Sequence, residues 1–206
     1  MAREDANKNG YSALRDVISK KFDFLSRRYL LEAIKATEVI PIVRQHLALG
    51  RKVVVFHDYK KGGGFNPFDI EVPRTLPEDF PEERKADFEA YKEALTEFRS
   101  RFKRLVNAPL SDLDSPIEVF KRELPDTMLV NGDEKKADLL ERYKRFQDDA
   151  IGPQVMLVQS AKNKGWSGHD TTGKHQRVLI NLGQPTAPTL AIQQEGRIYR
   201  TGQVSY

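Results

Sequence analysis

The chain has 206 residues, of which 39% are hydrophobic and 31% charged, with a formal net charge of +4 and no cysteine. This composition excludes a disordered chain, a disulfide framework and a thiolate metal site, and no apolar run reaches the ~20 residues that cross a bilayer. The polar N-terminus does not resemble a signal peptide, so we expect one globular cytoplasmic domain, with or without an elaboration, and no membrane partner.

Helical spacing of apolar residues predicts a helix over residues 11–35, with no clear stop. Thr37 is the expected N-cap of a second helix, with Pro41 in its first turn or at a kink. Gly50 is the expected end of this second helix, because glycine readily adopts the left-handed conformation found after helix C-termini.

Four short apolar runs predict buried strands at 52–56, 127–130, 155–160 and 178–182. Helices are expected at 116–122, with Ser115 as cap, and at 134–148, with Leu139, Leu140, Tyr143 and Phe146 inward. Strands that alternate with helices indicate βαβ units. The predicted fold class is therefore α/β, with a parallel sheet flanked by helices.

Residues 62–115 are expected to form a helical insertion rather than part of the sheet. Four prolines between 65 and 81 indicate an irregular linker. A long helix over 82–106 then carries apolar residues, mostly aromatic, at alternating three- and four-residue spacing. Such a seam packs on the rest of the domain or on a missing neighbour, and is less typical of a base-stacking platform.

His57 ends the first predicted strand, at the edge where open α/β sheets bind ligands. A hydrogen-bonded strand end is the preferred interpretation, and a ligand contact is the alternative. The histidines lack metal-binding spacing, so no metal site is predicted. The following loop contains Lys60, Lys61 and three glycines but not the P-loop pattern, so it is either a mobile loop or a contact for a nucleic-acid backbone.

The pattern Q-x-x-G-R-x-x-R-x-G-Q, at Gln193–Gln203, is the main functional motif. If it is helical, Arg197 and Arg200 share one face with Gln193. Two forked guanidiniums beside small glycines suit the charge of a transferring phosphoryl group. Six of the eight charged side chains in residues 151–206 are basic, which also suits ATP or nucleic acid. A solvated basic helix end and chance clustering of charge are the alternatives.

This motif resembles the last conserved motif of superfamily-2 helicases, in the form used by Swi/Snf-type remodelling ATPases. Residues 164–170, Lys-Gly-Trp-Ser-Gly-His-Asp, resemble the preceding motif, and Arg177–Leu182 supplies the strand between the two. The likeness is greatest to strawberry-notch-type helicases, including bacterial and phage forms. It covers roughly residues 35–60 and 125–203, and implies a RecA-like fold.

The resemblance implies the second RecA-like motor domain of an ATP-dependent DNA helicase or translocase. Arg197 and Arg200 would be the arginine fingers, and Gln193, Asp170 and Gly168 would contact ATP. ATP and Mg²⁺ would be bound mainly by a first domain that carries the P-loop. The implied nucleic-acid contacts are Ser160, Lys162, Lys164, Gly165, Trp166, Lys60 and Lys61, although Trp166 replaces a small residue and is equally suited to be a buried anchor.

These implications divide the chain into an N-terminal helical segment, residues 1–35, and a RecA-like domain, residues 36–206, with the insertion at about 62–115. No G-x-x-x-x-G-K-[ST] occurs, so the chain is expected to hydrolyse no ATP alone. The alternative function is a stand-alone, non-catalytic RecA-like module that binds nucleic acid or protein. A nucleotide-binding transferase is a third possibility, weakened because no G-x-G-x-x-G follows a strand.

Overall fold

The computed structural model describes residues 2–59, 64–73, 85–132, 135–162, 165–183, 185 and 187–204, with side chains from Gly10 onward. The chain divides into two compact units. The helical unit contains Met1–Arg27 and Phe65–Asp112, and the sheet unit contains Arg28–Gly64 and Leu113–Tyr206. Within the described residues, no helix is both long enough and apolar enough to cross a membrane.

The sheet unit is built on an all-parallel four-stranded sheet of order β2-β3-β1-β4. Its strands are β1 (Lys52–His57), β2 (Met128–Val130), β3 (Val155–Gln159) and β4 (Arg177–Asn181). In β1, Val54 pairs with Met156 on one side and with Leu179 on the other, so β1 lies inside the sheet. The expected α/β class with a parallel sheet is confirmed, and the arrangement is consistent with a RecA-like domain.

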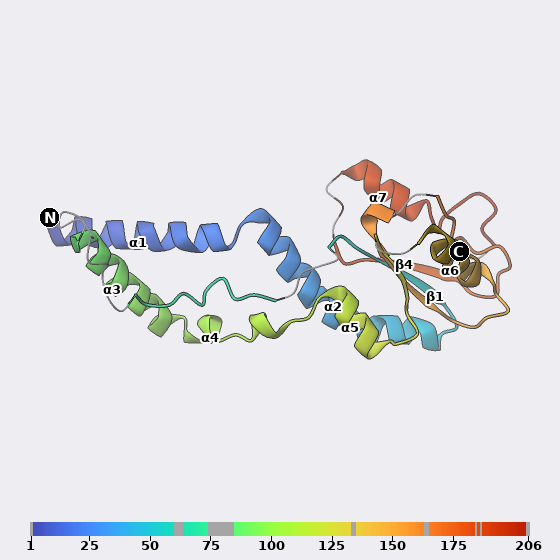
Figure 1. The fold of residues 1–206 in the computed structure, drawn as a ribbon, viewed down its shortest axis with the longest axis horizontal. Helices are drawn as coiled ribbons and strands as arrows, with labels where there is room; N and C mark the ends of the chain where they lie inside the picture. The colour runs from blue at the N-terminus through green and yellow to red at the C-terminus, as the bar shows by residue number, and fades with distance from the viewer. Residues whose placement is uncertain are drawn as a thin grey trace. The chain divides into compact units, whose positions relative to one another are not determined.

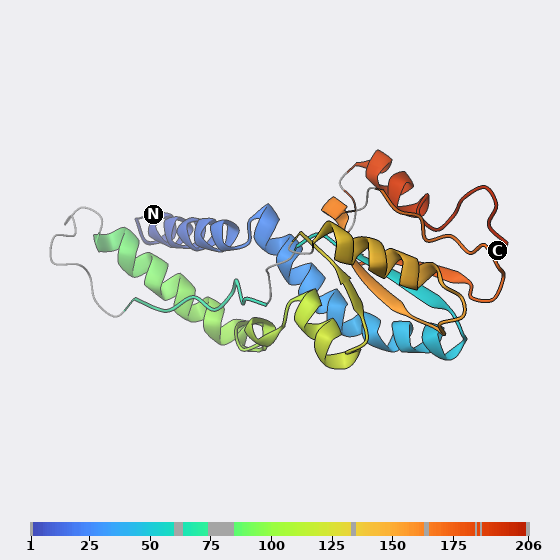
Figure 2. The same cartoon turned by 45° about the vertical axis from the view of Figure 1, so that its right-hand side comes forward.

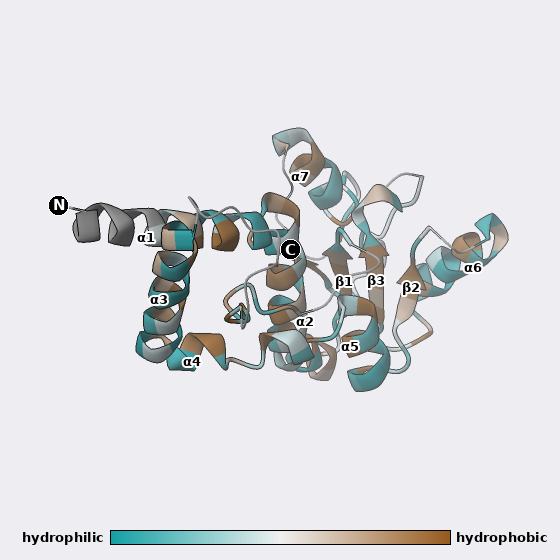
Figure 3. Ribbon diagram, turned by 60° about the vertical axis from the view of Figure 1, so that its left-hand side comes forward, coloured by the Kyte–Doolittle hydropathy of each residue, from teal (hydrophilic) through white to brown (hydrophobic). Residues whose placement is uncertain are grey.

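Both faces of the sheet are covered, as the alternating side chains of β1 require. Val53 and Val55 pack with helices α2 (Phe24–Ala48) and α5 (Pro116–Glu123). Val54 and Phe56 pack with helix α6 (Lys136–Gln147) on the other face. Figures 1 and 2 show the strands between α2 and α6, and Figure 3 shows how apolar β1 and β3 are.

Helix α2 corrects the predicted break near Pro41. The helix runs without interruption through Thr37 and Pro41, so Thr37 is an interior residue and not an N-cap. Pro41 is exposed, and the buried apolar face of α2 holds the helix against the sheet on both sides of it. The predicted end is confirmed, because Gly50 has φ 77° and the N–H of Arg51 reaches back to His46 O at 3.0 Å.

The helices around β2 and β3 follow local rules. Ser115 caps α5 as predicted, in a capping box with Glu118. In α6, Leu139 and Tyr143 pack against the core while Leu140 is 55% exposed, which corrects its predicted inward direction. The remaining described elements of the sheet unit are the short helix η3 (Ser160–Lys162) and helix α7 (Pro188–Glu195).

The helical unit pairs α1 (Ala2–Lys21) with α3 (Lys85–Arg101), followed by α4 (Lys103–Val106) and η2 (Leu110–Asp112). Its core contains Leu14, Ile70, Ala94 and Leu95. None of its described residues belongs to the sheet. The insertion therefore has its own packing face, as predicted, but its partner is α1, so the first residues and the insertion form one unit instead of two separate segments.

We expect Gly10→Ala to destabilise the helical unit. A Cβ at Gly10 would lie 2.3 Å from the backbone oxygen of Ala90, so α1 and α3 would have to move apart. Overpacking of this kind costs about 1–3 kcal/mol, and a contact of 2.3 Å with backbone atoms belongs in the upper part of that range, above the ~1 kcal/mol that alanine gains over glycine in a helix. Amide hydrogen exchange across α1 and α3 measures the effect. Ser12→Ala, at an exposed position of α1, is the control, and a more protected Gly10→Ala chain would contradict the prediction.

Candidate functional site

The two motif arginines lie beyond the end of helix α7. The helix ends at Glu195, and turns continue the chain, with the N–H of Arg197 bonded to Gln194 O at 3.0 Å. Ile198, between the arginines, is completely buried and anchors the segment. The expectation that both arginines share one helical face is therefore corrected, because they follow the helix in a turn held by Ile198.

Arg197 and Arg200 differ in their surroundings. Arg197 is half-buried and donates from Nη1 to Trp166 O at 2.8 Å, whereas Arg200 is exposed and donates from Nε to Gly196 O at 2.7 Å. Burial lowers the pKa of Arg197, and the positive charge of Arg200 lowers it further. Within the described residues, Arg200 forms no ion pair. Two neighbouring cations of this kind favour an anion beside them.

The two glutamines of α7 point in different directions. Gln193, the predicted ATP contact, is exposed. Gln194 is completely buried and donates to Ser160 Oγ at 3.1 Å, and this hydroxyl donates to the backbone oxygen of His57 at 3.2 Å. Gln194 therefore links α7 to the carboxyl ends of β1 and β3. Adjacent glutamines look alike in sequence, so nothing in the motif identifies this role.

The glycine-rich loop before β4 uses its backbone internally. The N–H of Gly168 donates to Arg197 O at 2.7 Å, and a Cβ at this position would lie 2.6 Å from the Trp166 ring. Gly168 is thus needed for packing and for the bond to the arginine segment. The N–H of Gly168 is therefore already bonded to Arg197 O, and the predicted ATP contact of Gly168 stays a prediction.

Asp170 also serves the loop. Its side chain is completely buried, and Oδ1 accepts the N–H groups of Thr172 at 3.0 Å and Gly173 at 2.9 Å. Its backbone oxygen accepts the N–H of Val204 at 3.0 Å, which ties the loop to the chain after Arg200. The Asp170 side chain thus shapes the turn of the loop, and its predicted ATP contact stays a prediction.

Trp166 is a buried anchor and not an open platform. It is 6% exposed, and its ring stacks on Tyr143 at 5.2 Å between ring centroids and 6° between planes. Tyr143, not Trp166, lines a cavity of about 270 Å³ beside the predicted nucleic-acid residues Lys162 and Gly165. The other walls of this cavity are Lys136, Leu139, Leu140 and Ala161. Base stacking on Trp166 is thereby corrected, because Tyr143 covers its ring.

The other predicted nucleic-acid contacts have different outcomes. Ser160 and Lys162 are partly exposed and directly follow β3, at the carboxyl edge of the sheet. Lys60, Lys61 and Lys164 lie outside the described residues. The structure thus brings Lys162 and Gly165 together at one cavity. Ser160 does not line this cavity; its hydroxyl accepts a hydrogen bond from Gln194 of α7.

A buried ionic network at the amino-terminal ends of β1 and β4 supports the glycine-rich loop. Lys52 Nζ lies 3.1 Å and Arg177 Nη2 lies 2.9 Å from the same oxygen of Asp149, and all three side chains are buried. Burial by itself would raise the pKa of the Asp149 carboxyl. Hydrogen bonds from Thr172, Arg177 and Lys52 outweigh burial and lower this pKa to about 2. The sequence gives one indication of this network, because Lys52 and Arg177 are cations at the starts of two strands.

Glu32 of α2 is a further buried carboxylate, and the sequence did not indicate it. It is 2% exposed, and its oxygens accept the N–H groups of Asp58 at 2.7 Å and Tyr59 at 3.2 Å, just after β1. Burial raises the pKa of Glu32 to about 7; the charge of Asp58 also raises it, while the two N–H groups and Arg28 oppose the rise.

The preferred interpretation of His57, a hydrogen-bonded strand end, is supported, since His57 is buried and its Nδ1 lies 3.0 Å from Tyr59 O.

We expect the sheet unit to lose stability as pH rises from about 4.5 to 7 because of Glu32. A carboxyl whose folded pKa is raised contributes stability that is complete below its ordinary pKa of 4.5 and is lost through its folded pKa of about 7. The shift corresponds to about 3 kcal/mol. Chemical denaturation between pH 4.5 and 8 measures the loss.

Glu32→Gln should flatten this pH dependence, because glutamine does not ionise. Glu38→Gln, at an exposed position of the same helix, is the matched control and should keep the wild-type slope. If the Glu32→Gln chain loses stability as steeply as the wild type, another group is responsible.

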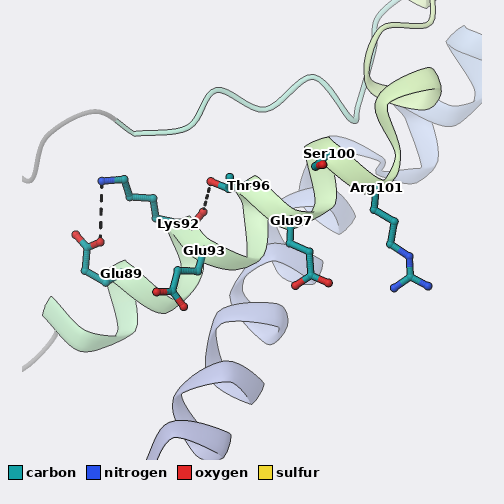
Figure 4. Close-up of a pocket in the computed structure, with 7 residues that line it drawn as sticks. All are labelled: Glu89, Lys92, Glu93, Thr96, Glu97, Ser100 and Arg101. Atoms are coloured by element: carbon teal, nitrogen blue, oxygen red, sulfur yellow. Dashed lines mark hydrogen bonds and ion pairs between the residues drawn. The ribbon is translucent and has the colours of Figure 1, made fainter.

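The helical unit has a separate concavity on α3. Figure 4 shows its lining side chains along one face of the helix, with Lys92 paired to Glu89 at 4.0 Å and Thr96 Oγ1 bonded to the oxygen of Lys92. These residues recur at helical spacing on the charged, outward side of α3. None of them belongs to the candidate site, and this face is a solvated helix surface.

The chain matches no protein-family model, no curated protein and no solved structure.

Proposed function

We propose that this chain is the second RecA-like domain of an ATP-dependent DNA helicase or translocase. The observation that carries the proposal is the arginine segment: Arg200 is exposed, its charge acts on Arg197, and it forms no ion pair within the described residues. An exposed guanidinium beside a second one is suited to a phosphate brought by another domain.

The surroundings of the arginines fit a phosphate better than a magnesium ion. Asp170 is buried and bonded to its own turn, so it does not offer an oxygen ligand at the surface. ATP and Mg²⁺ would therefore be held mainly by a P-loop domain, and ATP would supply the phosphoryl group. Arg197, fixed through Trp166 O, and Arg200 would then stabilise the negative charge that develops on transfer.

A nucleic-acid track is proposed at the carboxyl ends of β2 and β3. The cavity beside Lys162 and Gly165 combines the apolar side chains of Leu139, Leu140 and Tyr143 with lysines, a combination suited to a base and its phosphate. DNA is the proposed partner. A cytoplasmic location is part of the same proposal, and it agrees with a chain that has no cysteine.

ATPase measurements on the full-length protein encoded by the gene test the proposal. We expect hydrolysis that DNA stimulates, whereas the purified 206-residue chain should hydrolyse no ATP because it has no P-loop sequence. Robust turnover by the 206-residue chain would overturn the division into two domains. DNA binding by a full-length protein without ATPase activity would instead identify a stand-alone binding module.

DNA binding by the 206-residue chain is tested by fluorescence anisotropy with a labelled single strand. Affinity should fall as salt rises, because phosphate contacts release counterions. Lys162→Ala should weaken binding, and Lys121→Ala, at an exposed position of α5, is the matched control. Equal binding by both variants would exclude Lys162 from the track.

A further inference from the structure

The loop that carries the glycines and the segment that carries the arginines are held together by backbone contacts. Gly168 N donates to Arg197 O at 2.7 Å, and Val204 N donates to Asp170 O at 3.0 Å. Arg197 Nη1 returns to Trp166 O at 2.8 Å. The position of the arginines therefore depends on the position of residues 166–170.

That loop is in turn fixed by Arg177, the first residue of β4. Its Nε donates to Gly168 O at 3.1 Å, so Gly168 is bonded through its N–H to Arg197 and through its oxygen to Arg177. Arg177 also donates to the backbone oxygen of His175. The planar guanidinium of Arg177 thus joins strand β4 to the loop of residues 166–170, which contacts the arginine segment.

The guanidinium itself is held rigidly. Nη2 donates to Asp149 at 2.9 Å, the side chain is completely buried, and its Cζ lies 5.6 Å from the centroid of the Phe146 ring. Thr172 Oγ1 donates to the other oxygen of Asp149 at 2.5 Å. A side chain with so many fixed partners has one orientation, as a positioning element needs.

We propose that Arg177 is a positioning residue for the arginine pair, acting from Asp149 through Gly168 to Arg197. This inference rests on the proposed function, since it matters to catalysis only if the arginines stabilise a transferring phosphoryl group. A displacement of about 1 Å at a catalytic group is enough to lower a rate about 10²-fold. Arg177 sets where Arg197 lies without touching the phosphate.

Arg177→Lys in the 206-residue chain tests the positioning directly. Lysine keeps a positive charge beside Asp149, but it cannot also donate from a second nitrogen to Gly168 O in the forked geometry. Hydrogen exchange read by NMR should accelerate about tenfold at the amides of Gly168 and Val204, while the amides of Val53–Phe56 keep their protection. Arg51→Lys, directly before β1, is the matched control.

The same variant in the full-length protein should show a kcat for ATP lower by about 10²-fold with an unchanged KM. Unchanged exchange at Gly168 and Val204 would overturn the proposal. Equal acceleration at every amide, β1 included, with normal kcat would also overturn it, because Arg177 would then be structural only. If Arg177→Lys does not fold, Thr172→Val loosens Asp149 without altering Arg177 and should accelerate the same two amides.

The failure of the proposed function is separately visible. If Arg197→Ala leaves ATPase activity at the wild-type level, Arg197 is not catalytic, whatever Arg177 does. The exchange measurement on the 206-residue chain does not depend on ATP, so it still decides whether Arg177 fixes the loop.

Discussion

Asp149→Ala is expected to destabilise the sheet unit by about 3–5 kcal/mol, the range found when one partner of a buried ion pair is removed. Lys52 and Arg177 both end on this carboxylate, and their side chains are completely buried. Without Asp149, two cations would remain in the interior, and their partners among the described residues would be backbone oxygens and the face of Phe146. Chemical denaturation at pH 7 measures the loss.

Asp148→Ala is a close control for this experiment. Asp148 is adjacent and exposed, and among the described residues its side chain accepts one local bond, from the N–H of Ala150 at 2.9 Å. We expect this variant to lie within about 0.5 kcal/mol of the wild type, as surface substitutions usually do. Equal losses for the two variants would mean that the Asp149 carboxylate is not responsible for the stability of the network.

The strands were predictable because buried parallel strands are continuous apolar runs. The expected bounds of all four agree with the structure within one residue, as for Lys52–Phe56 against Lys52–His57. The cap of α5 was predictable because a capping box depends only on residues close in sequence, here Ser115 and Glu118. The course of α2 was not, because tertiary packing on both sides of Pro41 overrides the local tendency of proline to end a helix.

The site was predictable only as a set of motifs. Its internal contacts join residues far apart in sequence, such as Glu32 with the N–H of Asp58 and Arg177 with Asp149. Whether a polar side chain of a motif is buried or exposed depends on these contacts. Asp170 and Gly168 therefore belong to the predicted motif, yet serve its architecture, whereas Arg200 remains at the surface.

Under the proposed function, Arg200→Ala is expected to lower the DNA-stimulated ATPase rate of the full-length protein by about 10³–10⁵-fold, the effect of removing an arginine finger. The same change should leave the 206-residue chain within about 0.5 kcal/mol of wild-type stability. The Arg200 side chain is exposed, and its one described hydrogen bond goes to Gly196 O four residues earlier, so the folded domain loses little when the side chain is removed.

Thermal melts of the domain beside ATPase assays of the full-length protein separate a finger from a structural arginine. Arg145→Ala, at an exposed position of α6, should change neither quantity. A structural Arg200 would behave in the opposite way, with a destabilised domain and a full-length protein that retains its activity. That result would exclude the phosphate role of the segment after α7, because an arginine that waits for a phosphate from another domain contributes to the reaction and not to the fold.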